Sequence, residues 1–128
     1  MNTEIKPTAI IIDDMESMRK MAKVMLGAVG CEIIGEAENG QIGVKLYQEK
    51  KPDLVLLDIE MPVKDGISTL KSLLIKDPAA NVVMMTTVSN MAVVESCIYA
   101  GAKDYIHKDK DPATIKARLE EVVGDIFK

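Results

Sequence analysis

Short runs of consecutive apolar residues alternate along this chain with longer segments whose apolar residues recur every three or four positions. An uninterrupted apolar run bounded by turn residues is typical of a strand buried on both faces, and the wider spacing is typical of an amphipathic helix. The runs predict strands at residues 9–12, 31–37, 54–57, 82–85 and 104–108. The spaced segments predict helices at residues 15–29, 41–50, 66–76, 90–99 and from 112 to about 126.

Turn-forming residues separate these elements. Gly30 ends the first helix, Pro52 ends the second, and Asp111-Pro112 supplies an N-cap and a first-turn proline for the last. Strands that alternate with helices predict a parallel sheet with helices on both faces, joined by right-handed crossovers. The sequence therefore predicts an α/β fold, a three-layer α/β/α sandwich.

Composition narrows the function classes. The chain has 128 residues, enough for one domain with a real core, and a net charge of −4, which argues against nucleic acid as a partner because phosphate binding needs clustered Lys and Arg. No apolar run approaches the roughly 20 residues that cross a bilayer, and the N-terminus lacks the apolar core of a signal peptide. We expect a cytoplasmic chain with no membrane partner, in which Cys31 and Cys97 are buried small hydrophobes.

Polar residues follow four of the predicted strands: Asp13 and Asp14, Asp58, Thr86, and Lys108. Because parallel strands end at the same edge of a sheet, we expect these side chains to converge there. Three neighbouring carboxylates repel one another unless a cation joins them, and Mg²⁺ prefers such oxygen ligands. A cation, a lysine and a hydroxyl together suit a phosphoryl group, and the remaining carboxylate can act as nucleophile and form an acyl phosphate.

Each of these residues taken singly has a simpler interpretation. Asp13-Asp14 could cap a helix, Asp58 could be a turn residue at a strand end, Thr86 could bond to its own backbone, and Lys108 could be solvated. The combination at the ends of successive strands is what favours a site.

These residues stand in motifs that resemble the receiver domain of two-component response regulators, with a layout similar to the stand-alone CheY-type members of chemotaxis. The resemblance covers essentially the whole chain, and implies a flavodoxin-like, doubly wound, five-stranded sheet of order 2-1-3-4-5 in one receiver domain, residues 1–128, with no output domain. The matching segments are Ile-Ile-Ile-Asp-Asp at 10–14, Leu-Val-Leu-Leu-Asp-Ile-Glu-Met-Pro at 54–62, Asp-Gly at 65–66, Thr86, Ala-Gly-Ala-Lys-Asp-Tyr at 100–105, and Lys108.

The resemblance also implies roles for the strand-end carboxylates. Asp58 corresponds to the phospho-acceptor, which takes a phosphoryl group from a histidine kinase. Asp13 and Asp14 correspond to the acidic pair that binds Mg²⁺, with Asp58 and the backbone carbonyl of Glu60 as further ligands. The protein would then catalyse only its own phosphorylation and dephosphorylation, as a signalling switch and not as an enzyme.

The resemblance implies that further residues respond to phosphorylation of Asp58. Thr86 and Lys108 would bind the phosphoryl group, and Thr86 and Tyr105 would form the switch. The output would be a changed surface on the fourth helix, fifth strand and fifth helix, recognised by a protein partner such as the flagellar motor switch. On that surface we expect the partner to contact Val94, Tyr99, Tyr105, His107 and the exposed face of the helix at residues 113–123. A phosphatase is a further expected partner, and the chain is expected to be a monomer.

The sequence departs from the family pattern in three places. Asp109 follows Lys108 where the family usually has proline, so we expect a trans bond there, and Lys110 becomes a rival for the lysine role. Thr87 stands where the family often has alanine or glycine, and its bulk is hypothesised to narrow access to the site. Glu60 covers the site and slows attack by water, pairs with a lysine, or is an ordinary exposed acid.

Other functions use similar residues. An Mg²⁺-dependent phosphohydrolase with an aspartyl-phosphate intermediate, as in the haloacid dehalogenase group, would place its nucleophile on the first strand and need a longer chain with a cap. A receiver could also serve as a phosphate sink or scaffold, or be the N-terminal fragment of a larger regulator.

Overall fold

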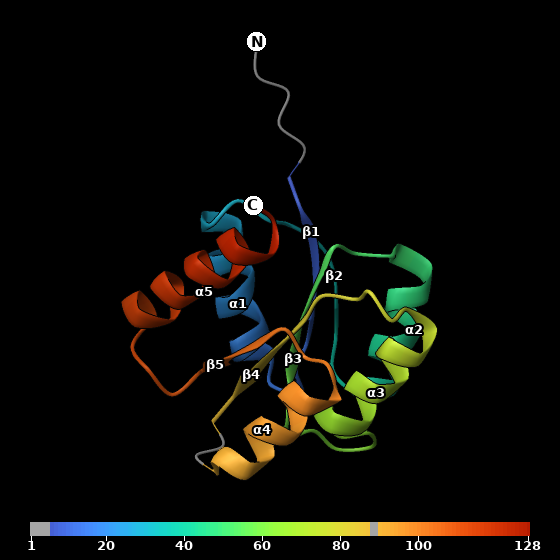
Figure 1. The fold of residues 1–128 in the computed structure, drawn as a ribbon. Helices are drawn as coiled ribbons and strands as arrows, with labels where there is room; N and C mark the ends of the chain where they lie inside the picture. Colours follow the sequence, from blue (N-terminus) through green and yellow to red (C-terminus); the bar gives the residue numbers. More distant parts are fainter. Residues whose placement is uncertain (1–5, 88–89) are drawn as a thin grey trace.

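The computed structural model describes residues 6–87 and 90–128, which form one parallel sheet flanked by helices (Figure 1). The sheet order is β2-β1-β3-β4-β5. The strands are β1 (Thr8–Ile12), β2 (Glu32–Ala37), β3 (Leu54–Asp58), β4 (Val82–Thr86) and β5 (Asp104–His107). The helices are α1 (Glu16–Ala28), α2 (Gly40–Lys50), α3 (Gly66–Lys76), α4 (Met91–Ala100) and α5 (Pro112–Ile126). The predicted elements, the α/β fold class and the strand order implied by the resemblance are confirmed.

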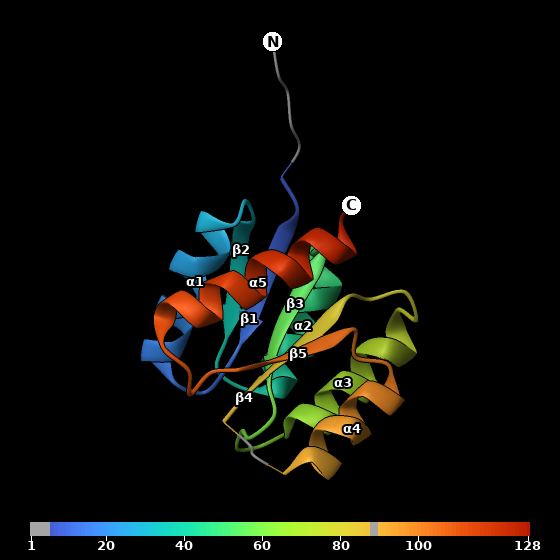
Figure 2. The same cartoon turned by 60° about the vertical axis from the view of Figure 1, so that its left-hand side comes forward.

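Helices cover both faces of the sheet (Figures 1 and 2). In β1, Ala9 and Ile11 pack into a core with residues of α1 and α5, while Ile10 and Ile12 pack into a second core with residues of α2, α3 and α4. Because successive strand side chains point to opposite faces, an entirely apolar strand supplies both cores. This is why the strands appear in the sequence as continuous apolar runs.

Side-chain caps start most of the helices. Asn39, Asp65, Asn90 and Asp111 each accept a backbone N–H from the first turn of α2, α3, α4 and α5 respectively. Helix α1 differs, because Met15 at its N-cap position makes no side-chain cap bond. Instead, the N–H of Met15 donates to Asp13 Oδ1, and Arg19 donates to the carbonyl of Asp13.

The smaller sequence predictions also have clear outcomes. Cys31 and Cys97 are buried free cysteines, as predicted. Tyr47 is buried and its hydroxyl donates to Asp77 Oδ2 at 2.7 Å, which links α2 to the end of α3. Phe127, which the sequence left without an interpretation, packs partly buried against the core under α1 and α5. None of the helices in the described parts of the chain is long and apolar enough to span a membrane.

Candidate functional site

Strand register brings the predicted site residues to one edge of the sheet. Ile12 of β1 pairs with Leu57 of β3, so the residues that follow them, Asp13 and Asp58, are neighbours. Asp58 in turn pairs with Met85 of β4, which places Thr86 directly beyond it. We predicted this convergence from the strand ends alone, and the strand register shows which residues are neighbours.

Three carboxylates meet at this edge. Asp13, Asp14 and Asp58 each offer an oxygen, and these oxygens all lie within 4.8 Å of one another. Asp13 and Asp58 are each only 3% exposed, whereas Asp14 is exposed to solvent. A set of hard oxygen donors with one open side fits a divalent ion such as Mg²⁺, which keeps several of its waters. The cluster could therefore hold a metal ion.

Lys108 places its ammonium between the two buried carboxylates. Its Nζ lies 3.0 Å from Asp13 Oδ2 and 3.1 Å from Asp58 Oδ1, and its side chain is 5% exposed. Lys110, the rival suggested by the sequence, is exposed. The peptide bond between Lys108 and Asp109 is trans, as expected. The geometry thus brings Lys108, and not Lys110, to the carboxylates.

One cation facing two buried carboxylates leaves the electrostatics of the site unbalanced. Burial is the main reason that the pKa of Asp58 is raised to about 6, and the charge of Asp13 raises it further, although Lys108 opposes both effects. Burial works to lower the pKa of Lys108, but its hydrogen bond to Asp13 and the charge of Asp58 outweigh this and raise it. The lysine is held charged, while Asp58 is ionised at a cost that a further cation would relieve.

The two residues predicted to form the switch lie on neighbouring strands. Thr86 is fully buried, and its backbone carbonyl accepts the N–H of Lys108 at 2.9 Å. Tyr105 is half-buried and packs edge-on against His107, with ring centroids 5.4 Å apart. Tyr105 and His107 also line a small cavity of about 180 Å³ between β5 and α5. Two residues of the predicted output surface, Tyr105 and His107, therefore line this cavity.

One residue of the predicted output surface is misplaced by the sequence analysis. Val94 is fully buried, so it contributes to the core and not to a partner surface. The apolar residues of α4 gave no clear stripe from which to choose its inner face. Tyr99, by contrast, is 95% exposed, in keeping with the prediction for it.

The helix-cap alternative does not describe all the contacts of Asp13, and the N-cap position of α1 is Met15. Asp13 Oδ1 does accept the N–H of Met15 at 2.9 Å, just before α1, but Asp13 Oδ2 accepts from Lys108 on the far side of the site. Glu60, which follows Asp58, is exposed. The structure thus ties Asp13 into the strand-end cluster as well as into the turn before α1.

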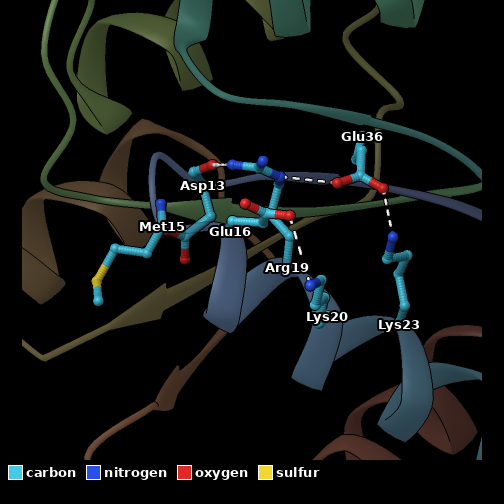
Figure 3. A network of polar contacts seen from close by, with 7 residues as sticks. All are labelled: Asp13, Met15, Glu16, Arg19, Lys20, Lys23 and Glu36. Carbon is cyan, nitrogen blue, oxygen red and sulfur yellow. Dashed lines mark hydrogen bonds and ion pairs between the residues drawn. The ribbon is translucent and has the colours of Figure 1, made fainter.

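Two residues near the site escaped the sequence analysis. Arg19, to which the sequence analysis gave no role, donates from Nη1 to the backbone carbonyl of Asp13 at 2.7 Å (Figure 3). Gly66, noted only as part of the Asp-Gly segment that matches the family, leaves no room for a side chain, because an added Cβ would collide with the backbone of Asp58 and Ile59. The Arg19 bond joins a side chain to a backbone carbonyl across a turn, and the backbone around Gly66 comes close to that of Asp58 and Ile59. Hydrophobic periodicity predicts neither kind of contact.

Comparison with known proteins agrees with this arrangement. Residues 9–120 match the model of the response regulator receiver domain. This chain belongs to that family. It is 39% identical over 113 residues to the chemotaxis protein CheY of Thermotoga maritima, covering 88% of this chain and 94% of that protein. It is 40% identical over 112 residues to CheY of Listeria monocytogenes, with coverages of 88% and 94%.

A solved structure supports the same assignment. In the crystal structure of the CheX–CheY–BeF₃–Mg²⁺ complex from Borrelia burgdorferi, the matching chain has a TM-score of 0.90 and 30% sequence identity. The match covers 98% of this chain and 92% of that one. The chain is therefore a CheY-like receiver domain with an acidic cluster that could bind Mg²⁺.

Proposed function

We propose that this receiver domain is a phosphorylation-activated switch in a two-component pathway, with Asp58 as its phospho-acceptor. The observation that carries the proposal is the position of Asp58, buried between Lys108 and the acidic pair at the end of β3. A carboxylate oxygen of Asp58 attacks phosphorus, the bond from phosphorus to the kinase histidine breaks, and its electron pair returns to the imidazole nitrogen. The product is an acyl phosphate on Asp58.

Mg²⁺ is the proposed cofactor. Asp13, Asp14, Asp58 and the backbone carbonyl of Glu60 would hold it, and it would supply positive charge against the negative charge of the transferring group. Thr86 and Lys108 are proposed to bind the phosphoryl oxygens, by a hydroxyl donor and an ammonium respectively. The burial of Lys108 beside Asp58 supports this role, since a desolvated ammonium interacts strongly with an anion.

Output follows from a two-state equilibrium that the phosphoryl group biases. We propose that Thr86 and Tyr105 carry the change to the surface of α4, β5 and α5, where a downstream protein binds. The cavity beside Tyr105 and the exposure of Tyr99 support that location. The similarity to chemotaxis CheY proteins supports a chemotaxis pathway. We further propose the flagellar motor switch as a partner, a phosphatase as a second partner, and a monomeric chain that acts in the cytoplasm.

Two measurements test this proposal. Incubation with Mg²⁺ and a small phosphodonor should add one phosphoryl group to the parent chain, detected by intact mass, and none to Asp58→Asn. Asp53→Asn is the matched control, because Asp53 lies in the same stretch but binds Thr8 at the opposite end of β3. Phosphorylation of Asp58→Asn would overturn the assignment.

The second measurement is a pull-down with and without beryllofluoride, which mimics the phosphoryl group. A change in the set of captured proteins supports a switch. An identical set in both states would favour a phosphate sink or scaffold over a switch.

A further inference from the structure

Arg19 joins three parts of the chain that meet behind the acidic cluster. It lies in the first turn of α1, and its Nη1 donates to the backbone carbonyl of Asp13 at 2.7 Å. Its Nε donates to Glu36 Oε1 on β2 at 2.8 Å, and the other oxygen of Glu36 pairs with Lys23, one turn further along α1 (Figure 3). The Arg19 side chain is only 13% exposed. Its planar guanidinium therefore binds two acceptors at once, the carbonyl of Asp13 on the buried side and the exposed carboxylate of Glu36.

The carbonyl that accepts from Arg19 belongs to Asp13, whose side chain is one of the three carboxylates of the cluster. The other polar atoms of Asp13 also have partners: its N–H donates to the carbonyl of Ala37, Oδ1 accepts the N–H of Met15, and Oδ2 accepts from Lys108. The Asp13 carbonyl is the acceptor of the peptide unit that leads into Asp14. Fixing that carbonyl fixes the plane of this peptide, and with it the direction in which Asp14 leaves the sheet edge.

We infer that Arg19 is a positioning residue for the metal site. It acts through the Asp13 carbonyl, by holding the turn between β1 and α1 so that the Asp13 and Asp14 carboxylates converge with that of Asp58. Glu36 supports this role by orienting the guanidinium from β2. The inference rests on the proposed Mg²⁺ site and adds a residue that does not touch the metal.

Charge alone predicts the opposite effect for Arg19. A guanidinium near three carboxylates repels an incoming Mg²⁺ ion, so removing it without any change of geometry should tighten Mg²⁺ binding. Removing a group that pre-orients the ligands should weaken binding, and outer partners of metal ligands typically contribute about tenfold or more in affinity. The sign of the change therefore separates the two roles.

The test measures Mg²⁺ affinity calorimetrically on the full chain for the parent, Arg19→Met and Lys20→Met. Arg19→Met keeps the apolar stem and should weaken Mg²⁺ binding about tenfold. Lys20→Met removes the same charge from the next residue, whose ammonium is exposed and faces Glu16 at 3.5 Å, and should leave the affinity within about twofold of the parent or slightly tighter. Without Mg²⁺, the amide of Met15 should exchange faster in Arg19→Met than in the parent, because its acceptor is Asp13 Oδ1.

The outcomes separate this inference from the proposed function. Unchanged or tighter Mg²⁺ binding by folded Arg19→Met, or an equal loss in Lys20→Met, overturns the positioning role and leaves the proposed site standing. A parent chain that does not bind Mg²⁺ overturns both. If Arg19→Met does not fold, Arg19→Lys takes its place: a compact ammonium lacks the planar, fixed donor geometry of the guanidinium, so an intermediate loss of affinity is expected, and parent-like affinity would contradict the inference.

Discussion

The ammonium of Lys108, just beyond β5, lies 3.1 Å from Oδ1 of Asp58, at the end of β3. The same ammonium also serves Asp13, so the two buried carboxylates share one lysine. Burial, and after it the charge of Asp13, keeps the pKa of Asp58 raised, to about 6, in spite of the neighbouring cation. The buried carboxylates therefore destabilise the fold when they are ionised, and a further bound cation would offset this cost.

Replacing Lys108 with methionine should destabilise the fold more strongly at pH 8 than at pH 5. Without the ammonium, ionised Asp13 and Asp58 face each other in a buried site, and removal of one partner from such a cluster costs on the order of 3 kcal/mol. Lys108 lowers the pKa of Asp58, so in the variant this pKa lies above 6; at pH 5 Asp58 is protonated, the repulsion is relieved, and the loss should be smaller. Urea unfolding at pH 5 and pH 8 measures both values. Lys110→Met, which removes an exposed lysine two residues away, should be close to neutral, and an equal loss for both variants would contradict this account.

Asp58→Asn should stabilise the fold at neutral pH while abolishing phosphorylation. The pKa of Asp58 is about 6 in the folded chain against an ordinary value of 3.8, so the folded state binds its proton more tightly than the unfolded state does. Its contribution to stability is therefore complete below pH 3.8 and is lost as the pH rises through 6. The variant avoids that loss.

The expected difference in unfolding free energy between Asp58→Asn and the parent is on the order of 2 kcal/mol at pH 8 in the absence of Mg²⁺, and close to zero at pH 4. Unfolding curves of both proteins across this pH range measure it. A difference that does not vary with pH would show that the ionisation of Asp58 is not the cause.

Mg²⁺ should raise the thermal midpoint of the parent, and Asp14→Asn should reduce that increment. The ion relieves repulsion within the carboxylate cluster, and a ligand that binds only the folded state stabilises it by mass action. A tenfold weaker affinity would reduce the stabilisation at saturating Mg²⁺ by about 1.4 kcal/mol. Glu16→Gln is the matched control, since Glu16 is an exposed acid at the start of α1 that pairs with Lys20. An equal increment in all three proteins would argue against a role for Asp14.

Gly66→Ala should destabilise the fold and slow phosphorylation together. The added methyl group would collide with the backbone of Asp58 and Ile59, so the end of β3 must move, at a cost of about 2 kcal/mol or more. Gly27→Ala is the control, because its Cβ would meet nothing within 4 Å in α1, and it should stabilise the helix by about 1 kcal/mol. Unfolding curves and phosphorylation rates of the two variants provide the comparison, and a Gly66→Ala protein that matches the parent in both would refute the close approach.

Thr87→Ala should speed phosphorylation by small phosphodonors. Thr87 is exposed at the end of β4 and lines a surface cavity of about 250 Å³ with Met91, His107, Asp109 and Lys110. Thr87→Val keeps the bulk and removes the hydroxyl, so it should behave like the parent if size is what matters. Rates measured with acetyl phosphate distinguish the cases, and equal rates for all three proteins would end the hypothesis.

Much of the fold and the core of the site could be predicted because the relevant signals are local. The apolar runs located each strand, and the Asp111 cap marked where the last helix begins. The strand-end rule brought Asp13, Asp58 and Lys108 together, whereas the choice of Lys108 over Lys110 came from the structure. Val94 was misplaced because α4 is apolar on more than one side, so hydrophobic spacing does not define its inner face.

By itself, the sequence determined the number and type of elements, the parallel sheet and the identity of the residues at its edge, since these depend on periodicity and on turn residues. Only the tertiary structure decided which contacts those residues make. Three such contacts depend on distances between separate elements: Lys108 binds two carboxylates, Arg19 donates a hydrogen bond to the Asp13 carbonyl, and the backbone near residue 66 leaves room only for glycine. Such distances are set by strand register and helix packing, which no local pattern encodes.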